Sequence, residues 1–140
     1  MIFDFYHLSA SPLERVLPTI CEKVLAGEGR LLVVADERVL AVLDEQLWTY
    51  APDSFLPHGR EGENQPVLLS PNPVAANGAR NIALADGICR EEALSFERAF
   101  YFFGSDRLDD ARTAWRALKG REGVESRYWK QVDGRWVQGP

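Results

Sequence analysis

Residues 30–48 read RLLVVADERVLAVLDEQLW, and this stretch decides the fold. The run at 31–35 is short, apolar and uninterrupted, which is typical of a strand buried on both faces of a parallel sheet. After it the period changes, and Leu40, Leu43 and Leu47 recur at the spacing of one helix face over about 37–48. A buried strand followed at once by an amphipathic helix predicts an α/β fold.

The residues before this stretch repeat the same order. The alternating, aromatic-rich segment 2–8 predicts a first strand. A helix is expected next, with Ser11 as its N-cap and Pro12 at its first position. Gly27 and Gly29 would close that helix. Strand, helix, strand and helix in succession are typical of a parallel sheet covered by helices.

The rest of the chain continues this pattern. Three short apolar segments predict further strands: 66–70, 81–86 and 99–104. Helical spacing predicts a last helix at 106–119. Asp133 and Gly134 are a strong turn signal inside 126–137, which predicts a C-terminal hairpin. We therefore predict one domain over 1–140, a Rossmann-like three-layer sandwich with a mostly parallel sheet and helices on both faces.

Composition and the first residues indicate a protein of the cytoplasm. The hydrophobic share is 46%, and no apolar run approaches the length of a membrane span. Asp4 interrupts the start of the chain, where a secretory signal would need a basic region and then an apolar one. Cys21 and Cys89 form neither a disulfide framework nor a CxxC motif, so both are expected to be reduced thiols.

Charge is unevenly distributed along the chain. The net charge is −5, which argues against a protein that grips nucleic acid with its whole surface. Residues 1–97 hold 7 Lys and Arg against 15 Asp and Glu, whereas residues 98–140 hold 9 against 6. An acidic partner would therefore be met at the C-terminal end of the chain.

Motifs for bound nucleotides and metals are missing. Neither GxGxxG nor GxxxxGK[ST] occurs, and the turn after the first strand, HLSASP, has no glycine. The two histidines and two cysteines, His7, His58, Cys21 and Cys89, do not fall at metal-ligand spacing. We expect neither a metal nor any other cofactor.

A hydrolase site is a weak alternative. Ser9 or Ser11 could combine with His7 and Asp4, but a capping serine beside a strand end is a commoner role. No nucleophile-elbow motif is present either. We predict no catalytic residue.

Large apolar side chains gather after the second helix, in the Pro-punctuated segment 48–57. They are Trp48, Tyr50, Pro52, Phe55, Leu56 and Pro57. Aromatic anchors of this kind dominate the energetics of protein interfaces, so the segment is a candidate docking site. The alternative is that the segment folds back and covers a sheet edge.

The expected last helix has two distinct faces. Core-facing spacing is shared by Leu108, Ala111, Trp115 and Leu118. A basic stripe runs beside it, with Arg107 before it: Arg112, Arg116 and Lys119. Guanidinium groups beside an aromatic ring suit a short peptide that carries a carboxylate and a bulky apolar side chain. The alternative is that these cations only complement the helix dipole.

Several quoted segments together resemble one family. They are FYHL at 5–8, the stretch 30–48, SFLPHG at 54–59, ARTAWRALKGREG at 111–123 and YWKQ at 128–131. The most specific is LDE-x-LW, followed seven residues after its Trp by F-x-PH. On these motifs the sequence resembles the chi subunit of bacterial DNA polymerase III holoenzyme along nearly the whole chain.

The resemblance implies a non-catalytic adaptor on a Rossmann-like sheet without a nucleotide. One surface would dock the psi subunit of the clamp loader, through Trp48, Pro52, Phe55, Leu56 and Pro57. Another would accept the acidic, Phe-ended C-terminal tail of single-stranded DNA-binding protein, through Arg107, Arg112, Trp115 and Arg116. Contact with DNA would then be indirect, and no contact with a membrane is implied.

Two alternative functions stay open beside this resemblance, and the sequence departs from the family pattern at one place. The same aromatic segment could serve a chi-like adaptor for a DNA repair helicase, or the chain could be a diverged α/β nucleotide-binding enzyme. Asp109 and Asp110 stand where the family has a basic residue, which predicts weaker or more salt-sensitive tail binding.

Overall fold

The structure is a computed structural model that describes residues 1–49 and 57–139. Its strands and helices, with η marking short 3-10 helices, follow in this order: β1 (Ile2–His7), α1 (Leu13–Ala26), β2 (Leu31–Val34), α2 (Glu37–Thr49), β3 (His58–Gly59), β4 (Val67–Ser70), β5 (Asn81–Leu84), η1 (Glu91–Ser95), β6 (Arg98–Phe103), η2 (Ser105–Arg107), α3 (Leu108–Leu118), β7 (Glu125–Val132) and β8 (Arg135–Gln138). None of the described helices is long and apolar enough to span a bilayer.

The strands form one mixed sheet in the order β3-β4-β2-β5-β6-β1-β7-β8. Neighbouring strands pair in parallel from β3 through β7, and only β8 runs antiparallel to its neighbour. The central strands are buried on both faces; all four residues of β2 are inaccessible to solvent. The predicted α/β fold with a mostly parallel sheet and a C-terminal hairpin is confirmed.

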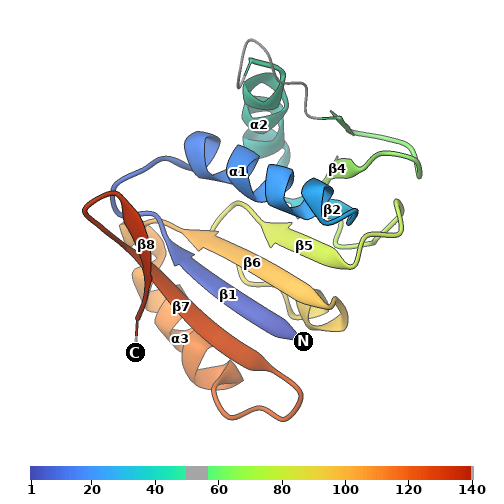
Figure 1. The fold of residues 1–140 in the computed structure, drawn as a ribbon. Helices are drawn as coiled ribbons and strands as arrows, with labels where there is room; N and C mark the ends of the chain where they lie inside the picture. Colours follow the sequence, from blue (N-terminus) through green and yellow to red (C-terminus); the bar gives the residue numbers. More distant parts are fainter. Residues whose placement is uncertain (50–56, 140) are drawn as a thin grey trace.

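Helices cover both faces of the sheet (Figure 1). On one face α1 and α2 pack their apolar stripes, including Leu40, Leu43 and Leu47, against alternate strand residues. On the other face α3, through Ala111 and Leu118, and η1, through Ala93, cover the remaining strand residues. Two apolar layers of this kind are what a parallel sheet needs, because both of its faces must be shielded from water.

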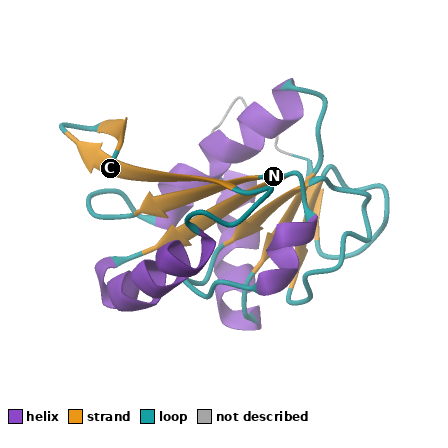
Figure 2. Ribbon diagram, turned by 90° about the horizontal axis from the view of Figure 1, so that it is seen from below, coloured by secondary structure: helices purple, strands orange, loops and turns teal. Residues whose placement is uncertain are grey.

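The C-terminal hairpin extends the sheet instead of standing apart from it. β7 pairs in parallel with β1, in the register Ile2↔Glu125 to Tyr6↔Trp129. Asp133 and Gly134 form the predicted turn with φ of 50° and 77°, the left-handed region that a tight hairpin turn requires. Figure 2 shows the hairpin reaching beyond the other strands at one edge of the sheet.

The predicted cap of the first helix is wrong. Pro12, not Ser11, occupies the cap position, and α1 begins at Leu13 without a side-chain cap. The hydroxyl of Ser11 instead accepts a hydrogen bond from Gln131 Nε2 at 2.9 Å. A partner supplied by the hairpin therefore replaces the local capping bond.

Candidate functional site

A cleft of about 570 Å³ lies between α3 and the hairpin; we call it the hairpin cleft. Its lining residues come from α3, β7 and the last described position: Leu108, Asp109, Arg112, Trp115, Arg116, Tyr128, Lys130 and Gly139. The structure thus brings together three of the four residues predicted for tail binding: Arg112, Trp115 and Arg116. Arg112 and Arg116 of the basic stripe therefore share one concave surface with the ring of Trp115, whereas Lys119 is not among its lining residues.

Two aromatic rings form the apolar part of this cleft. The rings of Trp115 and Tyr128 meet edge to face, with centroids 5.9 Å apart and an interplanar angle of 90°. The ring of Phe5 also packs edge to face against Trp115, with centroids 5.3 Å apart. Such support fixes the indole without burying it, since Trp115 and Tyr128 are both half-buried. Burial also raises the pKa of Tyr128, so its hydroxyl stays neutral.

Cations outnumber acids in the hairpin cleft. Among the residues that the structure describes, Arg112, Arg116 and Lys130 line it together with one acidic side chain, that of Asp109. The Arg112 side chain is 64% exposed, and its Nη1 lies 4.0 Å from Asp109 Oδ1. An exposed pair at that separation contributes little, so Arg112 is available to an incoming anion.

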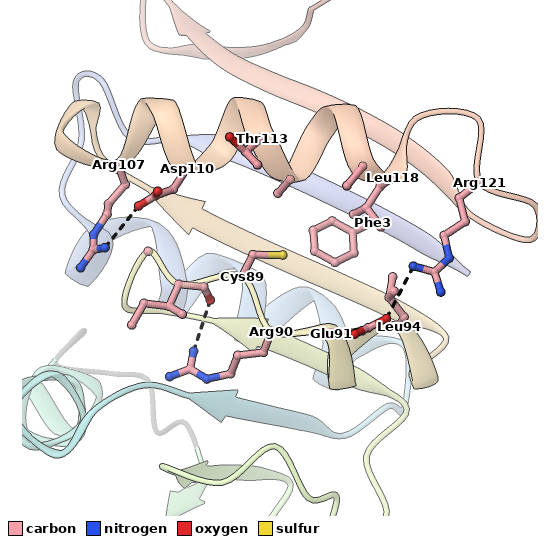
Figure 3. Close-up of a pocket in the computed structure, with 14 residues that line it drawn as sticks. Phe3, Cys89, Arg90, Glu91, Leu94, Arg107, Asp110, Thr113, Leu118 and Arg121 are labelled. Atoms are coloured by element: carbon pink, nitrogen blue, oxygen red, sulfur yellow. Dashed lines mark hydrogen bonds and ion pairs between the residues drawn. The ribbon is translucent and has the colours of Figure 1, made fainter.

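Arg107 lies on the other side of α3, in a second hollow that we call the η1 groove (Figure 3). This groove, of about 600 Å³, runs between α3 and the segment 87–94 and has apolar walls that include Phe3 and Leu118. Its arginines are paired: Arg107 with Asp110 at 3.3 Å, Arg121 with Glu91 at 3.8 Å and Arg90 with Asp86 at 2.7 Å. The geometry therefore separates Arg107 from the other predicted tail-binding residues.

The predicted psi-docking surface is described only in part. Pro52, Phe55 and Leu56 lie outside the described residues, as does Tyr50. Trp48, at the end of α2, is 55% exposed, and its ring lies 4.8 Å from the ring of His58. His58 is buried and its Nε2 is 3.1 Å from Asp44 Oδ1, while Pro57 is half-buried just before it. The exposed indole is thus fixed against a buried histidine instead of being packed into the core.

Three lining residues of the hairpin cleft were not predicted from the sequence: Tyr128, Lys130 and Gly139. Tyr128 and Lys130 are two positions apart, so a strand places them on the same face. That spacing was visible in the sequence, but the position of β7 beside β1 was not. Gly139 is held by its N–H, which donates to the Tyr128 carbonyl at 2.7 Å.

The loop between β1 and α1, where a nucleotide would sit in many α/β folds, is bound by the protein itself. The backbone N–H groups of Ala10 and Ser11 both donate to Gln131 Oε1, at 2.9 and 3.0 Å. The amides that could hold a phosphate therefore already have an acceptor.

The four residues of the hydrolase alternative do not assemble. Asp4 is fully buried on the α1 side of the sheet and accepts hydrogen bonds from arginines. His7 stacks on Phe103 and its Nε2 lies 3.1 Å from Ser105 Oγ. Asp4 and His7 point to opposite faces of β1, so Asp4 cannot orient His7. In the part of the chain that the structure describes, no three His, Cys, Asp or Glu residues are arranged to hold a metal ion.

Comparison with known proteins identifies one family. The family model described as DNA polymerase III chi subunit, HolC, matches residues 1–125 of the chain. A search of curated proteins found no match. The matched region includes the whole of α3, whereas the hairpin residues of the cleft come after it.

Proposed function

The chain belongs to the family of the DNA polymerase III chi subunit, an accessory and non-catalytic subunit, and on that basis we propose that it is a two-sided adaptor. One side binds the psi subunit of the clamp loader. The other binds the acidic C-terminal tail of single-stranded DNA-binding protein. The adaptor acts in the cytoplasm as a single domain, needs no cofactor and reaches DNA through the coating protein.

The hairpin cleft is the observation that carries this proposal. A tail that ends in Phe offers a carboxylate and a phenyl ring. Arg112 and Arg116 provide planar donors that match a carboxylate, and the edge-to-face pair of Trp115 and Tyr128 provides an aromatic wall. Lys130 adds a cation for the acidic residues further up the tail. Asp109 lies at the same cleft and lowers its net positive charge, which supports salt-sensitive binding.

Two modest contacts are enough for the proposed bridge. If one surface holds the clamp loader and another holds the coating protein, the second contact becomes intramolecular and gains from a high effective concentration. Trp48 supports the psi-binding side because it is a large exposed aromatic residue at the end of a rigid helix. A repair helicase that uses the same surface is the alternative partner.

Calorimetric titration with a short acidic peptide ending in Asp-Phe tests the tail site. We expect micromolar-range binding that weakens with salt, and a loss of at least about tenfold for Arg112→Ala, because a charge-assisted bond to the carboxylate disappears. The same peptide with an amidated C-terminus is the matched control ligand. Wild-type protein that binds both peptides equally, or neither, would contradict the proposal.

Two further variants test the tail-binding and psi-binding surfaces separately. Arg107→Ala tests whether Arg107 contributes to tail binding. We expect unchanged affinity for the peptide, because Arg107 lies in the η1 groove and not in the hairpin cleft. Trp48→Ala should abolish co-purification with the psi subunit while peptide binding stays intact. Loss of both activities in one variant would show instead that the two surfaces are not independent.

A further inference from the structure

A third hollow, which we call the α1 cleft, has no part in the proposed function. It measures about 440 Å³ and lies on the α1 side of the sheet. Figure 1 shows α3 on the opposite face. α1 forms one wall, and the sheet edge with the hairpin forms the other. Its lining includes four cations, Arg15, Lys23, Arg98 and Arg127, and three aromatic residues, Tyr6, Trp129 and Trp136.

The charge of this cleft is opposite to that of the whole protein. Of the described residues that line it, four are cations and none is a carboxylate, although the chain carries a net charge of −5. Asp4 lies beneath the lining, is fully buried and offsets one of the four. Arg15 and Lys23 form no ion pair with any residue that the structure describes. A strong local attraction for anions follows.

Asp4 holds two guanidinium groups side by side. Its carboxylate accepts from Arg98 Nε at 3.0 Å and from Arg127 Nε and Nη2 at 2.7 and 3.0 Å. Asp4 uses neither Nη group of Arg98 and leaves Nη1 of Arg127 unused. Two fixed donors with remaining N–H groups are well suited to a phosphate, which arginine binds with planar geometry.

The second wall offers aromatic surface at the same place. Trp136 stands edge to face against Tyr6, with centroids 5.1 Å apart, and Trp129 stacks beside Tyr6 at 6.2 Å. Both indoles are half-buried, so part of each ring remains accessible. Arg15 and Lys23 are eight positions apart on α1, or about 12 Å along the helix, and extend the cations along the cleft.

We infer that the α1 cleft binds a short segment of single-stranded nucleic acid. Phosphates lie against Arg98, Arg127 and the cations of α1, and a base packs on Trp136. A basic groove with aromatic platforms is the usual arrangement for such strands, because each nucleotide carries both a charge and a flat ring. An acidic peptide that lacks an aromatic side chain would use the cations but not the aromatic wall, whereas every nucleotide uses both. This direct contact goes beyond the indirect contact with DNA that the family resemblance implies.

The test is fluorescence anisotropy of the full chain with an end-labelled oligothymidylate of about twelve nucleotides. Two or three neutralised phosphates predict a slope of about −1.4 to −2.1 for log affinity against log salt. The double variant Arg15→Glu with Lys23→Glu should bind at least about tenfold more weakly, since both side chains are exposed and support no ion pair. Arg38→Glu reverses one exposed cation on α2, outside the cleft, and lowers the net charge by two units where the double variant lowers it by four; this control should bind as wild type.

Each outcome decides the proposal. The proposal is supported if the double variant loses binding to the oligothymidylate while Arg38→Glu and Arg112→Ala bind it as wild type does. No binding at low salt, or equal binding by the double variant, overturns it. Loss in Arg112→Ala, or displacement of the oligomer by the Phe-ended peptide, would assign the strand to the hairpin cleft. Thymidine monophosphate that binds as tightly as the oligomer would show a free-nucleotide site instead.

Discussion

Replacing Arg127 by Met should destabilise the protein through Asp4, a residue far from it in the sequence. Asp4 is fully buried and accepts four hydrogen bonds: one from Arg98 Nε, two from Arg127 and one from Trp129 Nε1 at 2.9 Å. Arg127→Met removes two of the four bonds and keeps most of the side-chain length. The carboxylate then stays buried with less compensation.

The size of the effect follows from burial. Breaking a fully buried ion pair costs about 3–5 kcal/mol, and Arg98 and Trp129 remain as partial compensation, so we expect about 2–4 kcal/mol at neutral pH. Burial by itself raises the pKa of Asp4, but the bonds from Arg127 and Trp129 and the charge of Arg98 outweigh it and lower that pKa. The variant loses the largest of these lowering contributions.

The effect should depend on pH in a defined direction. A carboxyl group whose pKa is lower in the folded state stabilises the protein above its unfolded pKa, about 3.9, and this stabilisation is lost as pH falls through the folded pKa. In Arg127→Met the pKa of Asp4 rises, so the variant escapes its buried charge by taking up a proton. The difference in unfolding free energy should therefore be largest near neutral pH and shrink in acid.

Urea unfolding followed by circular dichroism, at neutral pH and at several acidic values, measures both quantities. Arg135→Met is the control, because Arg135 is exposed on β8 and should change stability by less than about 0.5 kcal/mol. If Arg127→Met matched the control, or lost the same free energy at every pH, the carboxylate of Asp4 would not be what Arg127 stabilises.

Two further predictions concern single hydrogen-bond networks. Gln131→Leu should lower the free energy of unfolding by about 1–2 kcal/mol, because the amides of Ala10 and Ser11 lose their shared acceptor. Hydrogen exchange at these two amides should become faster, and unchanged exchange would contradict the structure. Tyr101→Phe should cost about 1–2 kcal/mol in urea unfolding, because the buried Tyr101 hydroxyl donates to the Gly87 carbonyl at 2.9 Å. Burial raises the pKa of Tyr101 to about 12, whereas an unfolded tyrosine has a pKa of about 10, so this difference should stay constant from neutral pH to about pH 9 and then shrink as pH rises towards 12; a difference that changes between neutral pH and pH 9 would refute it.

Much of the fold was predictable because its signals are local. The apolar run at 31–35, the spacing of Leu40, Leu43 and Leu47, and the turn at Asp133 and Gly134 each predicted an element that the structure contains. Periodicity reports which residues of one element share a face, and that information lies within a few neighbouring positions. The basic stripe with Trp115 on α3 was found in the same way.

Pairings between distant segments had no such signal. Ser11 was predicted as a helix cap from its neighbours in the sequence. In the structure its hydroxyl instead accepts a hydrogen bond from Gln131. Arg107 precedes the stripe in the sequence, but it ends the 3-10 helix η2, so the period of α3 does not set its direction. It lies in the η1 groove. A short local pattern does not show whether a residue far away in the sequence will supply a different hydrogen-bond partner.

The sequence by itself determined the α/β class, the main elements and the family resemblance, since these depend on local periodicity and short motifs. The tertiary structure alone decided which surfaces exist. Pairing β7 with β1 places Tyr128 and Lys130 beside α3 and Arg127 and Trp129 beside α1, so one strand helps to build a cleft on each face of the sheet. The physical reason is that sheet register depends on hydrogen bonds between residues more than a hundred positions apart, and on the burial that they make possible.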